Sequence, residues 1–214
     1  GVISAPGATI SLNLNALTTL AVNKLGADHS AANVNAVNAA VAQVFGLQQL
    51  QGTAVVATNS GSYNPADGLT EGEKYGAVLA GLSGMDKLNG GSVQATLDTL
   101  TSQLTVTGST PSLSDAGKYA VAAGAKTIAA SANNMHVLNS SNLSYGDTVA
   151  ALISYEPDPQ TEALGITQIS NTAGTTGSTK VPTVFDYANA NVTGVDSAPE
   201  LSLTNDVVKS KTPA

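Results

Sequence analysis

The feature that most constrains the fold is a pair of amphipathic segments between Leu14 and Leu47. In the second segment apolar residues recur every three or four positions, which places them on one stripe of a helix. They are Val34, Val37, Val41, Val44 and Phe45. Ser30 is the expected N-cap of this helix and Gly46 its expected stop. The segment therefore predicts a helix from Ser30 to Gly46 with one buried face.

The first segment carries a shorter stripe of the same kind. Its apolar residues are Leu14, Leu17, Ala21 and Leu25, and Gly26 is expected to end the helix. The few residues from Gly26 to His29 are too short to do more than reverse the chain. The two segments together predict a helical hairpin packed face to face.

The outer face of the second helix carries no charged residue, because none occurs between Ala31 and Phe45. Solvated helix faces usually carry Lys and Glu. The polar residues found there instead are Asn33, Asn35, Asn38 and Gln43. One interpretation is the uncharged surface typical of a secreted protein, and the other is contact with another protein. We take these four residues as the candidate interface.

Charge and cysteine content exclude several classes of protein. The 214 residues include no Arg and give a formal net charge of -7, which argues against nucleic acid and anionic membrane surfaces as partners. The absence of Cys excludes disulfides, thiolate metal sites and a Cys nucleophile. No apolar run reaches the roughly 20 residues that span a bilayer, so no membrane insertion is expected. A chain that starts at Gly1 is expected to be processed or excised from a longer one.

The rest of the chain also reads mainly as helix. Thr70 and Glu73 form a capping box for a helix that is expected to stop at Gly84, and Ser92 and Ser114 are the expected caps of two more. Further helices are expected at residues 115–133, 146–155 and 183–191 and after Ser197, and a short strand at 53–58. The predicted fold class is mostly α, made of helical hairpins or a bundle, with short extended segments at the N-terminus and near 53–58.

Composition and helix pattern divide the chain into five expected parts. They are an extended arm at 1–12, a helical bundle unit at 13–108, a second helical unit at 109–164, a Gly/Thr/Ser-rich loop at 165–182 and a helical hairpin at 183–214.

Several stretches resemble a known family. NALTTLAVNKLG, NVNAVNAAVAQVFGL, YNPADGLTEGEKYGAVLAGLSGMD and SVQATLDTL are similar to a helical module of very large repetitive bacterial adhesins built of Ig-like or cadherin-like domains. The resemblance covers residues 13–104, and 183–208 more loosely. It implies a location on the bacterial cell surface and a structural or adhesive role. It carries no catalytic motif and no functional residue.

Chemistry-bearing motifs are scarce. The two histidines, His29 and His136, lie near no nucleophile signature, so we expect no enzyme and no catalytic residue. Calcium is the one cofactor considered, with acidic loops at Asn64, Asp67, Glu71 and Glu73 and at Glu156, Asp158 and Glu162. Neither loop has EF-hand spacing, and Glu73 is already explained as the partner of Thr70 in the capping box. We therefore expect no metal site and no bound cofactor.

The sequence favours a non-enzymatic structural or adhesive module of a bacterial extracellular surface protein. Its expected partners are copies of itself or neighbouring domains, joined through uncharged surfaces into a fibre or lattice, with the N-terminal arm pairing with a neighbouring copy. Lys at Asn35 and Asn38 is expected to disrupt that assembly without unfolding the monomer. The alternative is an adhesin that binds a glycan or peptide near Tyr145 and Tyr155, with calcium as a stabiliser.

Overall fold

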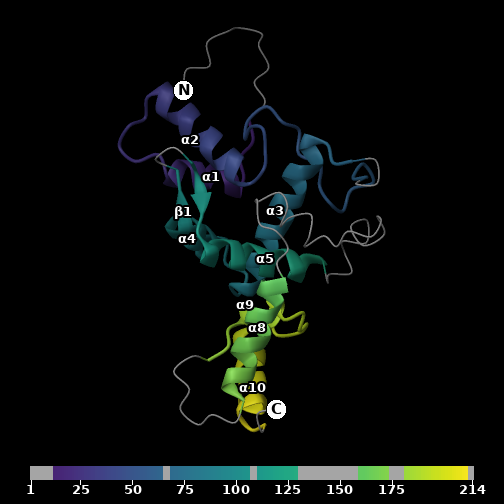
Figure 1. The fold of residues 1–214 in the computed structure, drawn as a ribbon. Helices are drawn as coiled ribbons and strands as arrows, with labels where there is room; N and C mark the ends of the chain where they lie inside the picture. Colours follow the sequence, from purple (N-terminus) through teal and green to yellow (C-terminus); the bar gives the residue numbers. More distant parts are fainter. Residues whose placement is uncertain (1–11, 65–67, 107–109, 130–158, 174–180, 212–214) are drawn as a thin grey trace.

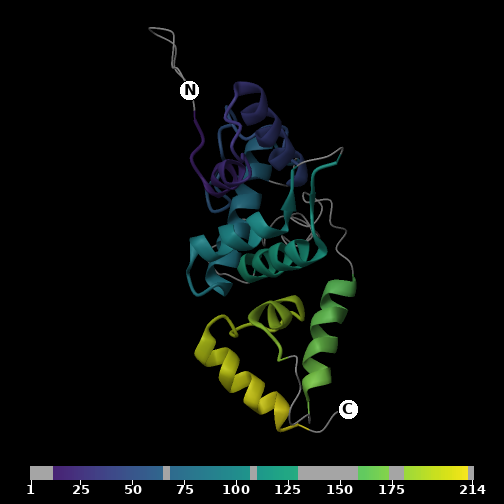
Figure 2. The same cartoon turned by 90° about the vertical axis from the view of Figure 1, so that its left-hand side faces the viewer.

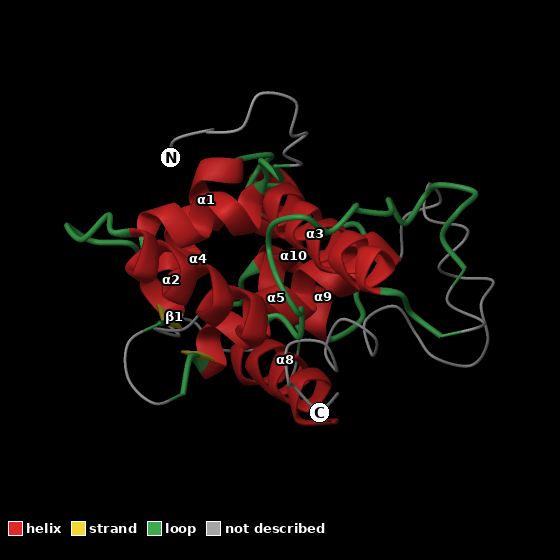
Figure 3. Cartoon of the chain, turned by 90° about the horizontal axis from the view of Figure 1, so that it is seen from above, coloured by secondary structure: helices red, strands yellow, loops and turns green. Residues whose placement is uncertain are grey.

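The computed structural model describes residues 12–64, 68–106, 110–129, 159–173 and 181–211. These residues form eight helices and one two-stranded sheet, so the predicted mostly α fold class is confirmed (Figures 1 and 3). The helices are α1 (Ala16–Asn23), α2 (Ala31–Val44), α3 (Glu71–Leu88), α4 (Val93–Gln103), α5 (Asp115–Ala129), α8 (Pro159–Thr172), α9 (Val184–Asn189) and α10 (Ala198–Lys209). The strands β1 (Leu104–Thr105) and β2 (Ser112–Leu113) pair antiparallel.

The N-terminal hairpin has the predicted form. The Ser30 hydroxyl accepts a hydrogen bond from the Asn33 N–H and caps α2, and Gly46 follows the helix in the left-handed conformation with φ 67°. The turn between α1 and α2 uses Gly26, whose φ is also 67°. Both helix ends are therefore fixed by short-range hydrogen bonds and backbone preference.

The start of α1 differs from the prediction. Asn15 is its N-cap and accepts hydrogen bonds from Leu17 and Thr18 N–H, so Leu14 lies before the helix and outside its buried stripe. The extended residues 12–15 alternate in direction, and Asn13 and Asn15 make the inward hydrogen bonds. Leu14 therefore points outward and is 89% exposed.

The predicted capping box of α3 is confirmed, but the predicted stop at Gly84 is wrong. Glu73 and Thr70 cap the first turn, and the helix continues to Leu88. Gly84 is needed inside the helix because a Cβ there would overlap the Gly124 carbonyl oxygen of α5. The glycine permits close contact of α3 and α5, which pack more extensively than any other described pair of helices.

Residues 53–58 form no β-strand, which corrects the strand prediction. They cross the first turns of α3, where the Val56 N–H donates to the Gly72 carbonyl at 2.9 Å. Side chains at Gly72 and Gly76 would collide with the backbone of this segment. The β-branched composition suggested a strand, but the backbone docks on a helix and no strand lies beside it.

One core joins α1 to α5, so the expected boundary near residue 108 does not separate two cores. The large buried side chains of this core are Leu17, Leu20, Val41, Phe45, Leu50, Tyr75, Val78, Leu82, Met85, Leu100 and Val121. α5 joins it because Val121 and Ala125 face α3 across the glycine contact. The unit thus extends through α5.

α8, α9 and α10 lie at the end of the molecule opposite α1 and α2 (Figures 1 and 2). Residues 165–172 belong to α8, which corrects the loop expected at 165–182. Gly165 allows α8 to approach α9, because a Cβ there would lie 2.6 Å from the Asp186 carbonyl. α9 lies within the helix expected at 183–191, and α10 begins directly after its predicted cap Ser197, whose hydroxyl makes no capping hydrogen bond. Residues 1–11 of the extended arm predicted at 1–12, and the helix predicted at 146–155, lie outside the described residues.

Candidate functional site

The candidate site is an apolar groove of about 700 Å³ among α1, α2 and α4. α1 contributes the largest share of its lining residues, and α2 and α4 contribute two each. The lining residues are Leu14, Asn15, Ala16, Thr18, Thr19, Ala21, Val22, Leu25, Val34, Asn38, Gln51, Val93 and Leu97. None of them is charged.

Two asparagines shape the end of the groove where the chain enters α1. Asn13 donates to the carbonyls of Leu50 and Thr53 at 2.8 and 2.9 Å, and its backbone N–H donates to the Gln51 side chain at 2.7 Å. Asn15 donates to the buried Tyr75 hydroxyl at 3.1 Å. These bonds hold the backbone on both sides of Leu14, so the outward leucine is fixed in place by its neighbours.

The contact of α1 with α4 holds the other side of the groove. The Lys24 ammonium donates to the Thr101 carbonyl at 3.0 Å, and the Asn23 amide donates to the Thr101 hydroxyl at 3.3 Å. On the groove side of these helices, Val22 is 68% exposed and Val93 is 52% exposed. Large apolar side chains therefore face solvent from rigid helices that are held by polar contacts elsewhere.

The four sequence-derived interface residues occupy different places. Asn38 lines the groove, whereas Asn35 and Gln43 are exposed on α2 outside it. Asn33 points into the hairpin turn, where its amide donates to the carbonyls of Leu25 at 3.0 Å and Asp28 at 2.5 Å. The structure thus brings only Asn38 to the groove.

Sequence reasoning missed Leu14, Val22 and Val93 as groove residues. It placed Leu14 on a buried stripe and singled out neither Val22 nor Val93 as exposed. The available signal was the alternation in Leu12-Asn13-Leu14-Asn15, which is typical of an extended segment with opposite faces. The exposure of Val22 and Val93 depends on which neighbours cover each helix, and local spacing does not carry that information.

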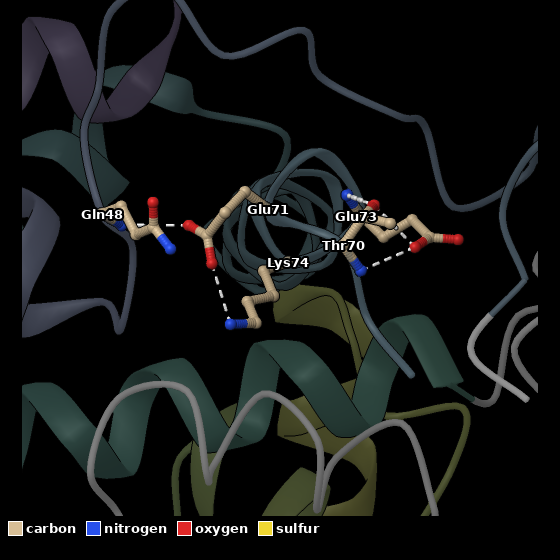
Figure 4. A network of polar contacts seen from close by, with 5 residues as sticks. All are labelled: Gln48, Thr70, Glu71, Glu73 and Lys74. Carbon is tan, nitrogen blue, oxygen red and sulfur yellow. Dashed lines mark hydrogen bonds and ion pairs between the residues drawn. The ribbon is translucent and has the colours of Figure 1, made fainter. Parts of the chain in front are cut away.

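The first acidic loop does not converge on a metal position among its described residues. Glu71 and Glu73 point to opposite sides of α3 (Figure 4). Glu71 accepts from the Lys74 ammonium at 2.8 Å and the Gln48 N–H at 3.0 Å. Glu73 accepts from the Asn64 N–H at 2.6 Å and from the Thr70 N–H and hydroxyl at 2.8 and 2.7 Å.

Protein donors thus occupy the oxygens of both carboxylates. Burial alone would raise the pKa of Glu73, but the three hydrogen bonds outweigh it and hold that pKa below its ordinary value. Burial also raises the pKa of Glu71, but the contacts with Lys74 and Gln48 outweigh it and hold that pKa below its ordinary value. The described residues hold no group of three His, Asp or Glu side chains arranged for a metal ion.

The remaining candidate residues are placed as follows. Asp67, His136, Tyr145, Tyr155, Glu156 and Asp158 lie outside the described residues, and of Glu162 only the backbone is described. His29 lies in the α1–α2 turn, where its Nε2 is 3.0 Å from the Gly26 carbonyl. It therefore has a structural contact in the turn.

A second, more polar cavity of about 380 Å³ lies beside the C-terminal ends of α3 and α5. Lys87 pairs with Asp196 at 2.5 Å, and Lys126 donates to the Asn189 carbonyl at 2.7 Å. The bond from Lys87 lowers the pKa of Asp196. Cations at helix C-termini also balance the helix dipole. Because both lysines have such partners, the apolar groove is the stronger candidate site.

Comparison of the chain with protein-family models, with curated proteins and with solved structures gives no match. Among the described residues no helix combines the length and the apolar character needed to cross a bilayer.

Proposed function

We propose that this chain is a non-enzymatic structural or adhesive module of a bacterial extracellular surface protein that self-associates through the groove among α1, α2 and α4. The main observation behind this proposal is that Leu14, Val22 and Val93 are exposed at a groove with no charged lining residue. Contiguous apolar surface on a soluble protein typically marks a contact site. The uncharged lining lowers the cost of removing water from such a contact.

The expected strength of the contact follows from the burial that the groove offers. Covering an exposed Val or Leu side chain contributes about 1.5–3 kcal/mol, so the three side chains together contribute about 5–9 kcal/mol. Association itself costs about 4–15 kcal/mol in lost rotational and translational freedom. The two ranges overlap, so the contact is reversible and depends on concentration. A tethered or repeated module on a cell surface supplies the high local concentration that such a contact needs.

The low charge and absent cysteine support the extracellular assignment, and the resemblance to helical modules of repetitive adhesins supports the surface role. The groove adds a physical reason for the uncharged face of α2, because Asn38 lines it. The partners in this proposal are copies of the chain or neighbouring domains of the same surface protein.

Light scattering over a range of concentrations tests the proposal. We expect the wild-type chain to form assemblies larger than the 21.2 kDa monomer as concentration rises, with or without a calcium chelator. Val22→Lys should raise the concentration needed at least tenfold, because it places a charge in the apolar contact. Val22 is exposed, so circular dichroism and the thermal midpoint should remain those of the wild type.

Val55→Lys is the matched control, since Val55 is an exposed valine that does not line the groove. It should assemble as the wild type does. A wild-type chain that stays monomeric at every concentration would overturn self-association as the function. If Val22→Lys and Val55→Lys both assembled as the wild type does, the groove would be excluded as the contact site.

A further inference from the structure

The helix α10 exposes two large apolar residues on its outer face. Of its twelve residues only Asn205 is buried, whereas Leu203 is 68% exposed and Val207 is 49% exposed. Asn205 holds the inner face, accepting from the Tyr187 hydroxyl at 2.8 Å and donating to the Pro182 carbonyl at 3.0 Å. Leu201 and Val208 are half-buried beside this amide, whereas Leu203 and Val207 on the outer face are open to another contact.

The outward residues form an uncharged stripe. Pro199, Leu203 and Val207 are spaced four residues apart and therefore lie on one side of the helix, about 6 Å apart along its axis. Glu200, which is close to this stripe, is drawn back to the helix start, where its carboxylate accepts from the Ser197 hydroxyl at 2.6 Å. Asp206 lies at the edge of the stripe.

The stripe and the groove have matching chemistry and lie at opposite ends of the chain (Figures 1 and 2). A helix that places apolar residues at i and i+4 into an apolar groove is a common mode of protein recognition. Both surfaces lack charge at their centres, so neither leaves an unpaired charge in the contact. Because they are at opposite ends, one copy cannot close the contact on itself.

We infer that the outer face of α10 in one copy docks in the groove among α1, α2 and α4 of the next copy. Leu203 and Val207 are the anchors, and Leu14, Val22 and Val93 cover them. This contact joins two different surfaces, so a pair of copies retains one free groove and one free α10. Such heterologous contacts extend into an open filament unless the rotation between copies closes a ring. The inference rests on the proposed function and names the partner of its groove.

Complementation between two blocked variants tests this inference. Val22→Lys blocks the groove and leaves α10 intact, and Leu203→Lys blocks α10 and leaves the groove intact. Each variant alone should remain monomeric at concentrations where the wild type assembles. An equimolar mixture should form a species of twice the monomer mass and no larger one, because only one productive contact remains. The same mixing experiment with Val207→Lys in place of Leu203→Lys should give the same result.

Leu164→Lys is the control, because Leu164 is an exposed leucine of the neighbouring helix α8. It should assemble as the wild type does. If Leu203→Lys and Val207→Lys assembled as the wild type does while Val22→Lys did not, the α10 contact would be overturned. The proposed function would still stand. A mixture that stays monomeric would also overturn the α10 contact. If Val22→Lys assembled normally, the groove would not be the contact site, and both proposals would be overturned.

Discussion

At the scale of single residues, amide side chains replace the charged pairs that many surfaces use. Asn13, Asn33 and Asn205 each bind backbone carbonyls of segments that are distant or turn-forming. A neutral amide satisfies such buried carbonyls without the desolvation cost of an ammonium or guanidinium group. The abundance of Asn in this chain is therefore in part a structural feature, and it explains how the described part of the fold holds with few ion pairs.

Glu73 is the exception, a carboxylate that is only 4% exposed. Glu73→Gln should lower the free energy of unfolding at neutral pH by about 1–3 kcal/mol, because the Gln amide nitrogen cannot accept the hydrogen bonds that Asn64 and Thr70 donate. The pKa of Glu73 lies lower in the folded state than its reference of 4.5 in the unfolded chain. Its contribution is thus complete well above pH 4.5 and is lost as pH falls through the folded pKa.

Urea unfolding at several pH values measures this effect. The difference between wild type and Glu73→Gln should shrink as the solution is acidified below about pH 4.5. Asp98→Asn, at an exposed helical position, is the control and should change stability by less than about 0.5 kcal/mol. A wild-type advantage that stays constant down to pH 2 would contradict the assignment.

At the scale of elements, glycines determine how closely neighbouring segments approach. Gly84 and Gly124 form the crossing of α3 and α5, and Gly72 and Gly76 receive the segment at 53–58 on α3. Glycine normally weakens a helix, by about 1 kcal/mol relative to Ala. Here the cost is offset by the close contact, because the helices are locked together at positions where any Cβ would hold them apart.

Gly84→Ala tests this balance. Helix propensity alone favours Ala by about 1 kcal/mol, but the added Cβ would collide with the Gly124 carbonyl and lie 2.8 Å from Ile128 Cγ1. Overpacking of this kind costs about 1–3 kcal/mol or more where backbone is in the way. We therefore expect a net loss of about 2 kcal/mol in the free energy of unfolding, measured by urea denaturation.

Gly61→Ala is the matched control, because a Cβ at Gly61 meets no atom within 4 Å. Its stability should stay within about 0.5 kcal/mol of the wild type. A Gly84→Ala variant as stable as the wild type would mean that the two helices can separate at little cost.

At the scale of the whole molecule, two apolar surfaces without a charged residue at their centres lie at opposite ends of the molecule. Among the described residues, Lys87 with Asp196 joins two distant segments of one copy, and the other two ion pairs lie within single helices. An assembly built on the apolar surfaces therefore depends on burial of apolar area, while the net charge of -7 keeps free copies apart at low salt.

Salt dependence follows from this arrangement. Raising sodium chloride from 0.05 to about 0.5 M should leave the assembly intact or strengthen it, because screening weakens the repulsion between acidic copies and removes no attractive ion pair. Light scattering at fixed protein concentration measures the change. In the same assay Asn38→Lys, within the groove, should weaken assembly at least tenfold, and Asn35→Lys, outside the groove, should not. Dissociation by salt would indicate an interface held by charges.

The sequence determined the helical class and most helix starts. Ser30, Thr70 and Ser92 each cap a helix as their side chains predicted, because a cap is a hydrogen bond between residues two or three positions apart. Local patterns of this kind depend little on the rest of the chain. The uncharged face of α2 was visible for the same reason.

Only the tertiary structure decided which faces are covered. Spacing placed Leu14 on a helix stripe, but the hydrogen bonds of Asn13 and Asn15 turned it outward, and Val93 stays half-exposed among the described elements. Gly84 looked like a helix stop and became a packing position because α5 lies against it. Exposure and close approach are properties of pairs of segments far apart in the chain, so the groove and the outward stripe of α10 emerge only when those segments are folded together.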